Sequence, residues 1–243
     1  MQLRRFIGIG LILCMMVLAA ACRPGSQLAA KPYKETQFLM DTIVEITAYG
    51  PEAEGAVKAA FGEFQRVQQL SNRFDPNSQL SKINQAAGRE KVQVDPELTA
   101  MISEAIGISR KLDGAFDITV GALTDLWGVG SKGDFVPSQD EIDRLLPLVD
   151  YRLIQVDAAA NTVFLPKPGM KLDLGGVAKG YALTKAVAKL KAAGVVSALV
   201  NAGGDIRVIG AKPDGDAWRI GVQDSRKADS MIAKIALKGW DSL

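Results

Sequence analysis

Residues 172–181, LDLGGVAKGY, constrain the fold more than any other stretch of the chain. Apolar and polar residues alternate from Met170 to Leu174, a period-2 pattern that predicts a strand. After the two glycines, apolar residues recur every three or four positions until Gly194, which predicts a helix. A second apolar run, SALVNAGGD at residues 197–205, ends in a second glycine pair. The sequence therefore predicts a strand, a helix and a strand, with a glycine turn at the end of each strand.

The first glycine turn has the features of an anion site. Gly175 and Gly176 allow close approach to the backbone, and the following helix presents unpaired N–H groups and the positive end of its dipole. Lys179 falls in the first helical turn, where a cation is disfavoured unless an anion such as a phosphate compensates it. Asp173 adds an acceptor suited to a base edge, a hydroxyl or a metal-bound water. The alternative is an ordinary strand-to-helix turn with a solvated lysine.

The N-terminal segment has the form of a secretory signal. Arg4 and Arg5 precede an apolar run that ends in three alanines and Cys22. A cysteine at that place resembles the lipobox of bacterial lipoproteins. We therefore expect residues 1–21 to be a lipoprotein signal peptide and Cys22 to carry the lipid. A plain cleaved signal and an uncleaved anchor are the alternatives.

The signal implies an exported protein. We expect it to be lipid-anchored to a bacterial membrane in the cell envelope, facing the periplasm or the exterior. Polar residues with two prolines follow Cys22, so residues 22–35 are expected to be a tether and residues 36–243 the folded domain.

Composition limits the partners and the chemistry. Hydrophobic residues make up 48% of the 243 residues, enough for a sizeable core. Residues 1–21 hold two arginines and no acid, so the 29 basic and 27 acidic residues become 27 of each without the signal, and nucleic acid is not an expected partner. Histidine is absent from the sequence, which excludes Ser-His-Asp and Cys-His catalysis within the chain.

The other elements are predicted from apolar periodicity and capping residues. Single strands are expected over residues 36–49 and 231–237, and strand hairpins over residues 151–174 and 206–222, the latter turning at 213–216. Helices are expected over residues 52–70, after Ser78, from Asp95 to about Leu112, and from Ser138, where Glu141 completes a capping box. The fold class is therefore α+β.

A glycine motif after residue 127 is interpreted as accidental. Gly128, Gly130 and Gly133 match GxGxxG, the pattern of dinucleotide-binding turns. No predicted strand runs directly into these glycines and no helix opens on them, so a Rossmann site is not expected.

Six segments in order resemble one family, the ApbE-type flavin transferases, or FAD:protein FMN transferases. They are FLMDT, SNRFDPNSQLSKIN, GAFDITVGALTDLWGVG, LDLGGVAKGYAL, ALVNAGGDIRVIG and WRIGVQD, from Phe38 to Asp224. The resemblance implies an ApbE-like, T-fold-like mixed sheet with packed helices. It also implies a Mg²⁺-dependent enzyme that cleaves the pyrophosphate of FAD, releases AMP and joins FMN to a threonine hydroxyl of an exported redox-complex subunit.

The resemblance also implies site residues. The implied FAD contacts are Met40, Phe74, Ala115, Phe116, Asp117, Asp173 and Lys179, and the loop around Gly176 is implied to offer a backbone carbonyl to Mg²⁺. A glycine turn beside an anion site does expose carbonyl oxygens, the hard ligands that Mg²⁺ prefers. No catalytic residue is assigned.

Purely structural roles stay open for several of these residues. Met40 and Phe74 are also compatible with core positions, and Asp117 with capping a helix at Thr119. Asn201 and Asp205, which flank the second glycine pair, are candidates for bracing that turn.

Two departures from the family pattern stand out. Asp41 occupies a place where many members have glycine. The family's threonine-serine-glycine segment and its later carboxylate and threonine metal ligands are expected after residue 243, so the C-terminal part of the domain is expected to be missing. A magnesium ion held by one carbonyl binds weakly at best, and we therefore expect the 243-residue chain to be inactive by itself.

Two other functions remain open. One is an FAD pyrophosphatase, which releases FMN and AMP because water replaces the threonine. The other is a non-catalytic flavin-binding lipoprotein.

Overall fold

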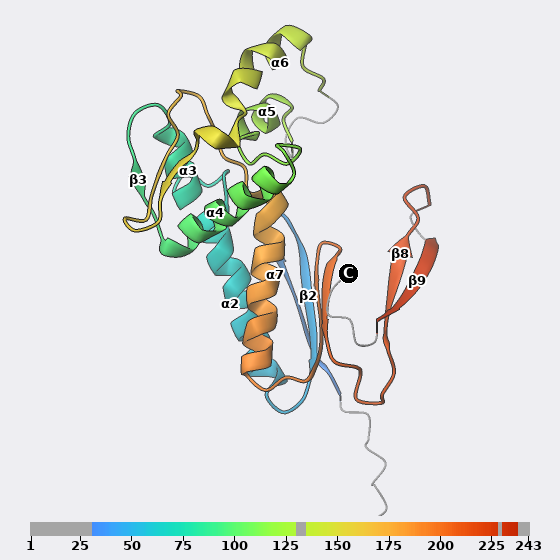
Figure 1. Ribbon diagram of the computed structural model, residues 1–243. Helices are drawn as coiled ribbons and strands as arrows, with labels where there is room; N and C mark the ends of the chain where they lie inside the picture. Colours follow the sequence, from blue (N-terminus) through green and yellow to red (C-terminus); the bar gives the residue numbers. More distant parts are fainter. Residues whose placement is uncertain (1–30, 130–134, 228–229, 238–243) are drawn as a thin grey trace, which may run out of the picture.

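The computed structural model describes residues 31–129, 135–227 and 230–237. A four-stranded sheet carries two long helices on one face and a strand hairpin beyond the other, with shorter elements gathered at one end of the helices (Figure 1). The helices are α2 (Ala53–Ser71), α3 (Gln79–Gln85), α4 (Pro96–Lys111), α5 (Gly121–Leu126), α6 (Gln139–Leu145) and α7 (Gly175–Ala192), with 3₁₀ turns at Leu146–Leu148 and Tyr151–Leu153.

The strands form three antiparallel groups. They are β1 (Tyr33–Leu39), β2 (Thr42–Tyr49), β3 (Val92–Gln93), β4 (Gln155–Asp157), β5 (Thr162–Phe164), β6 (Ser197–Ala202), β7 (Asp205–Ile209), β8 (Trp218–Gln223) and β9 (Met231–Leu237). The order is β1-β2-β6-β7 in the largest sheet, β3-β5-β4 in the second, and β8-β9 in the third. The expected α+β class is confirmed.

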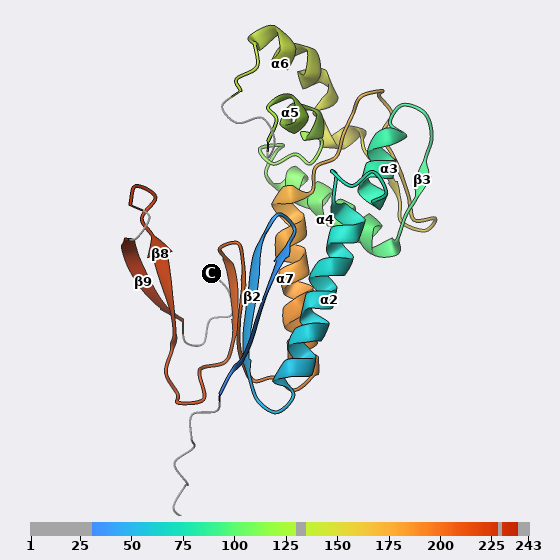
Figure 2. The same ribbon diagram turned by 180° about the vertical axis from the view of Figure 1, so that it is seen from behind.

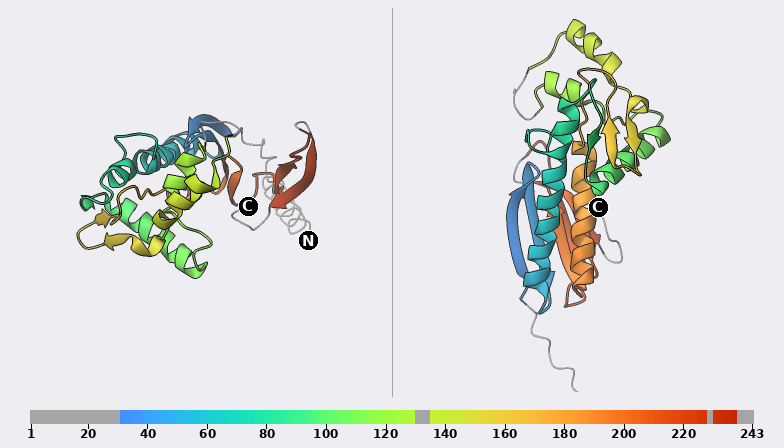
Figure 3. Two further views of the ribbon diagram at one scale, coloured as in Figure 1. Left: turned by 90° about the horizontal axis from the view of Figure 1, so that it is seen from above. Right: turned by 90° about the vertical axis from the view of Figure 1, so that its left-hand side faces the viewer.

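The core lies between the largest sheet and the helices α2 and α7, which run side by side along it (Figures 1 and 3). Alternate residues of β2, Val44, Ile46 and Ala48, are fully buried toward these helices. Phe64 of α2 and Ala186 of α7 are buried in the same core. This packing fixes the start of α7 beside the β1–β2 turn, where the candidate site lies.

The far side of the sheet holds a second, smaller core. Trp218, Ile220 and Leu237 of the β8–β9 hairpin pack with Ile206 and Val208 of β7. Figure 2 shows this hairpin on the side of the sheet opposite to α2 and α7.

The single strand expected over residues 36–49 is wrong. The segment is a hairpin of β1 and β2, joined by Met40 (φ 53°) and Asp41 (φ 57°). A two-residue turn with both φ angles positive suits the twist of a hairpin but ordinarily uses asparagine and glycine, so Met40 and Asp41 carry no turn signal. The Met40 N–H donates to Gln68 Oε1 at 2.5 Å, which ties the turn to α2.

The strand expected to lead into the first glycine pair is also wrong. The side-chain amide of Asn84 takes the place of a neighbouring strand, because it accepts from Leu172 N (2.7 Å) and donates to Leu172 O (3.0 Å). The segment makes one isolated parallel bridge, between Val120 and Lys171. The earlier part of the predicted 151–174 hairpin is confirmed, as β4 paired with β5.

The hairpin expected over residues 206–222 is wrong as well. Its turn exists, with Lys212 N donating to Asp216 O at 3.1 Å, but the two strands join different sheets. The Trp218 indole N–H donates to Gly210 O at 3.1 Å, and Gly210 has a φ of 58°. The connection therefore bends at Gly210 and carries β8 away from β7. The final strand over residues 231–237 is confirmed as β9.

The predicted helices are confirmed with their caps. Ser78 Oγ accepts from Ser81 N at 3.0 Å, Asp95 accepts from Glu97 N at 2.8 Å, and Ser138 forms a capping box with Glu141. These contacts satisfy N–H groups that a helix leaves free at its start.

Some predictions fall where the structure is not described. The signal peptide at residues 1–21, Cys22, and the glycines Gly130 and Gly133 lie outside the described residues. β1 begins at Tyr33, three residues before the predicted start of the domain. Within residues 31–129, 135–227 and 230–237, no helix has the length and apolarity needed to cross a bilayer.

Candidate functional site

The start of α7 is held by short contacts. The Asp173 carboxylate accepts from Gly175 N at 2.8 Å, and the Leu174 carbonyl accepts from the N–H groups of Val177 and Ala178 at 2.9 and 2.8 Å. None of the described residues accepts a hydrogen bond from the Gly176 N–H. A side chain at Gly176 would bring its Cβ to 3.2 Å from the Phe116 ring, so this glycine is needed for close packing. One backbone donor at this end of α7 is thus available to a ligand.

A pocket of about 360 Å³ opens beside the start of α7. Four of the predicted FAD contacts line it, Met40, Phe74, Asp173 and Lys179, together with Gly175. Small-molecule sites have volumes of roughly 300–1,000 Å³. The pocket is therefore of a size to hold part of a dinucleotide.

Lys179 is a cation without an ion-pair partner among the described residues. It is half-buried in the wall of the pocket. The expectation that it lies in the first turn of the helix is wrong, because α7 begins at Gly175 and Lys179 is its fifth residue. Since the dipole effect fades beyond the first turn, the available charge of Lys179 is the stronger indication of an anionic ligand.

Three predicted FAD contacts lie outside the residues that line this pocket. Ala115 is exposed, and Phe116 packs against Gly176. Both carboxylate oxygens of Asp117 accept hydrogen bonds within the protein, one from Thr119 N (2.8 Å) and the other from Tyr151 N (2.8 Å). The structure thus gives Asp117 a bracing contact at Thr119, and its FAD contact stays a prediction.

The second glycine pair is braced in the way that its flanking residues allow. Asn201 Oδ1 accepts from Gly204 N at 2.9 Å, and Asp205 is exposed. The positive φ of Asp41, 57°, lies in the region that favours glycine, which accounts for the glycine expected at that place. Asp41 lines the larger pocket beside Met40.

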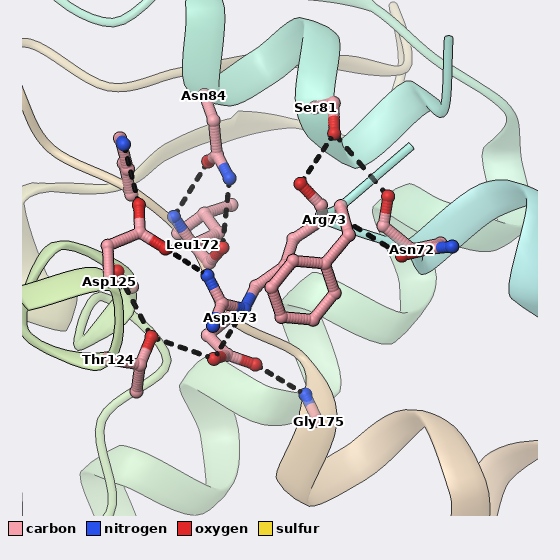
Figure 4. A network of polar contacts seen from close by, with 12 residues as sticks. Asn72, Arg73, Ser81, Asn84, Thr124, Asp125, Leu172, Asp173 and Gly175 are labelled. Atoms are coloured by element: carbon pink, nitrogen blue, oxygen red, sulfur yellow. Dashed lines mark hydrogen bonds and ion pairs between the residues drawn. The ribbon is translucent and has the colours of Figure 1, made fainter. Parts of the chain in front are cut away.

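Sequence reasoning missed Arg73, which lies at the centre of the polar network in Figure 4. Its side chain is only 10% exposed. Its Nε is 3.0 Å from Asp173 Oδ2, and its guanidinium also pairs with Asp125. Asp125 in turn accepts from Lys171 Nζ at 2.6 Å, and Thr124 Oγ1 donates to Asp173 at 3.0 Å. Its partners Asp125 and Asp173 are far along the chain, so no local pattern pointed to Arg73. Its place next to Phe74, a predicted FAD contact, was the one indication in the sequence.

Arg73 and Phe74 form a wall between two pockets. A second pocket of about 260 Å³ shares both residues and adds Asn84, Asp125 and Lys171. The Arg73 guanidinium lies 4.2 Å from the centre of the Phe74 ring, whose residue is 56% exposed. Phe74 is therefore a surface aromatic held in place by a cation, and a core position for it is excluded.

The ion pairs of Asp125 lead to a pH prediction. Burial raises the pKa of Asp125, but hydrogen bonds from Lys171 and Arg73 outweigh burial and hold the pKa below its usual value. A carboxylate with a lowered pKa stabilises the fold above its unfolded pKa of about 3.9, and this contribution is lost as the pH falls through its folded pKa. In urea unfolding, the stability gap between the unaltered chain and Asp125→Asn should therefore be larger at pH 7 than at acid pH. An equal gap at both would contradict these ion pairs.

The described residues fit a magnesium ion only in part. They contain no group of three or more histidine, cysteine, aspartate or glutamate side chains placed to hold a metal. Asp41 lines the larger pocket, and Mg²⁺ is often bound by one or two carboxylates together with substrate phosphates. Both carboxylate oxygens of Asp173 are engaged within the protein, one by Gly175 N and the other by Arg73 and Thr124. Gly176 lies in the first turn of α7, whose carbonyls point toward the helix C-terminus. The residues fit an ion that arrives with a diphosphate, and the role of Gly176 stays a prediction.

Comparison with known proteins decides the family. A family model described as the ApbE family matches residues 40–243. The chain belongs to the ApbE family. The ApbE protein from Thermotoga maritima has a crystal structure that is 35% identical, with a TM-score of 0.77, over 86% of this chain and 68% of that one. The ApbE flavin transferase from Vibrio cholerae is 26% identical, with a TM-score of 0.73, over 80% and 64%. These structures confirm the expected ApbE-like fold.

Curated ApbE relatives carry the name FAD:protein FMN transferase. The protein from Treponema pallidum is 32% identical over 236 residues, and that from Klebsiella pneumoniae is 31% identical over 208 residues. The matches cover 89% and 85% of this chain. The chain spans 64% of the length of each relative.

Proposed function

We propose that this ApbE-family chain is an FAD:protein FMN transferase, which moves FMN from FAD to a threonine hydroxyl of an exported redox-complex subunit and releases AMP. One observation carries the proposal: Lys179, without an ion-pair partner among the described residues, lines the same pocket as Met40, Phe74 and the start of α7. A cation beside a helix N-terminus suits a diphosphate, and an exposed aromatic ring suits a planar ring system. The names of the curated relatives point to the same substrate.

The proposed reaction is a phosphoryl transfer. The threonine oxygen attacks the phosphorus of the FMN half, the bond from that phosphorus to the bridging oxygen breaks, AMP leaves with that oxygen, and the hydroxyl proton passes to solvent. Such a reaction needs positioning and neutralisation of charge more than a covalent nucleophile, so the lack of histidine is no obstacle. Lys179 and the Gly176 N–H would hold the diphosphate.

Magnesium belongs to the proposal as part of the substrate complex. When bound, Mg²⁺ would offset charge on the diphosphate oxygens, with Asp41 as the carboxylate on this chain that is placed to hold it. We expect FAD binding to tighten when magnesium is added.

The transferase is tested with FAD, magnesium and a partner protein that carries an acceptor threonine. The 243-residue chain and the product of the complete genomic reading frame are assayed side by side, with the Vibrio cholerae transferase as a positive control. Mass spectrometry detects FMN on the threonine, and chromatography detects AMP and free FMN. From the complete reading frame we expect covalent FMN and AMP in equal amounts, and no transfer to a Thr→Ala acceptor.

The alternative functions predict different products. Free FMN and AMP without covalent flavin on the acceptor would reject the transferase in favour of the pyrophosphatase. Tight FAD binding without any AMP would reject both in favour of a flavin-binding lipoprotein.

Export and lipid anchoring are part of the same proposal, because the acceptor subunits are expected outside the cytoplasm. The signal at residues 1–21 and Cys22 support it. Radiolabelled palmitate should be incorporated by the unaltered protein and not by Cys22→Ala. Equal labelling of both, or of neither, would reject lipidation at Cys22.

A further inference from the structure

Asp173 presents an electrostatic difficulty at the proposed phosphate site. Its carboxylate lies directly before α7, accepts from Gly175 N at 2.8 Å, and lines the pocket that contains Lys179. A negative charge near a helix N-terminus stabilises the helix. The same charge would repel a diphosphate that approaches the same N–H groups, unless a cation compensates it.

Arg73 supplies that cation from within the protein. Its Nε lies 3.0 Å from Asp173 Oδ2, on the carboxylate oxygen that does not accept from Gly175 N. The side chains of Arg73 and Asp173 are only 10% and 17% exposed, so water screens the pair weakly. Figure 4 shows the guanidinium between Asp173 and Asp125, and Thr124 donates to the same Asp173 oxygen that pairs with Arg73.

The charges of this cluster balance without Lys179. Arg73 and Lys171 carry two positive charges, and Asp125 and Asp173 carry two negative charges, all within the ion pairs described above. Lys179 therefore remains as a positive charge outside this balanced cluster, and the other charged residue that lines its pocket is the exposed Asp41. Loss of Arg73 would leave Asp173 uncompensated, so that two carboxylates, Asp41 and Asp173, would oppose Lys179 at the pocket.

We propose that Arg73 is a positioning residue of the FAD site: it neutralises Asp173 and fixes it as the cap of α7, so that the diphosphate meets the helix N–H groups and Lys179 without a repelling carboxylate. The inference rests on the proposed function for the identity of the ligand as FAD. Arg73 also holds the Phe74 ring at 4.2 Å, which places an aromatic surface at the same pocket.

A double-mutant cycle that removes the two charges separately and together separates this role from simple packing. Four variants of the 243-residue chain are compared by titration of flavin fluorescence with FAD as the probe: Arg73→Met, Asp173→Asn, the double variant, and Arg73→Lys. Thermal unfolding is followed for each. Arg66→Met is the matched control. Arg66 lies on α2, just before Arg73 in the chain, and pairs with two carboxylates, Glu63 and Glu97, but it lines neither pocket.

The neutralising role predicts an unusual pattern of affinities. Arg73→Met should raise the Kd for FAD by about tenfold or more, because one partner of a weakly screened charge pair is left alone. Adding Asp173→Asn to Arg73→Met should restore the Kd to within about threefold of the unaltered chain, because the carboxylate that Arg73 compensated is then also gone. The Kd of Arg73→Lys should lie between those of the unaltered chain and Arg73→Met, because the lysine ammonium keeps the positive charge but lacks the planar guanidinium fork. Arg66→Met should lower the unfolding temperature and leave the Kd unchanged.

Other outcomes would overturn the inference. If the double variant bound FAD no better than Arg73→Met, or if Arg66→Met raised the Kd as much as Arg73→Met, Arg73 would have only a general structural role. If Arg73→Met fails to fold, the double variant and Arg73→Lys still test the inference. A folded double variant that binds FAD about tenfold more weakly than the unaltered chain would show that Arg73 does not act by neutralising Asp173.

Failure of this inference is distinct from failure of the proposed function. A double variant without restored affinity, in a chain that binds FAD, rejects the role of Arg73 and leaves the transferase intact. FAD binding with restored affinity, but without transfer to the acceptor threonine by the product of the complete reading frame, rejects the transferase and supports the role of Arg73. No FAD binding by the unaltered chain would overturn both.

Discussion

Replacing Lys179 by alanine is expected to raise the Kd for FAD at least about tenfold, because the substitution removes the one positive charge at the pocket that has no ion-pair partner among the described residues. The effect should be strongest at low salt, since added ions screen a half-exposed charge. Fold stability should change little, because none of the described residues forms an ion pair with Lys179. Flavin fluorescence titrations at two salt concentrations measure the affinity.

Lys185→Ala is the matched control for this experiment. Lys185 lies on the same helix, 3.8 Å from Glu97 and over the Tyr181 ring, and it does not line the pocket. Its loss should leave FAD affinity unchanged. Equal affinities for the unaltered chain and Lys179→Ala would remove Lys179 from the phosphate site.

Gly121→Ala should have the largest effect on stability among the changes near the site. A Cβ at Gly121 would lie 2.7 Å from the Lys171 carbonyl oxygen and 2.8 Å from its carbon, so α5 would have to move off the backbone that leads into α7. That movement draws Thr124 and Asp125 away from the Arg73 network. We expect a loss of about 1–3 kcal/mol in the free energy of unfolding, and weaker FAD binding as a consequence.

The same substitution elsewhere provides the control. Gly107 lies inside α4 with nothing within 4 Å of an added Cβ. Gly107→Ala should therefore stabilise the chain by up to about 1 kcal/mol, because alanine favours the helix. Urea unfolding of both variants measures the difference. Equal effects of the two substitutions would show that α5 does not approach Lys171 as closely as described.

The sequence predicted those parts of the fold that local patterns determine. The helices α2, α4 and α7 have three- and four-residue apolar spacing and local caps, and they appear where expected. The three wrong strand predictions have different causes. Asn84 replaces a strand beside Leu172, Met40 and Asp41 turn without glycine, and β8 leaves the sheet that β7 joins. None of these choices leaves a local signal.

In the candidate site, too, local segments predicted some residues and the role of another depended on the fold. Lys179, Asp173, Met40 and Phe74 were expected from short segments that resemble the ApbE family, and the structure gathers them at one pocket. The role of Arg73 was not predicted, because it depends on carboxylates from two other segments that only the fold brings together. Ala115 and Asp117 belong to a resembling segment but are not among the residues that line that pocket.

A crystal structure of the chain with bound FAD tests the central claim most directly. We predict that the diphosphate lies within hydrogen-bonding distance of the Gly176 N–H and Lys179 Nζ, with Asp173 still paired to Arg73. A diphosphate bound elsewhere, with Lys179 turned toward solvent, would contradict the phosphate site at the start of α7.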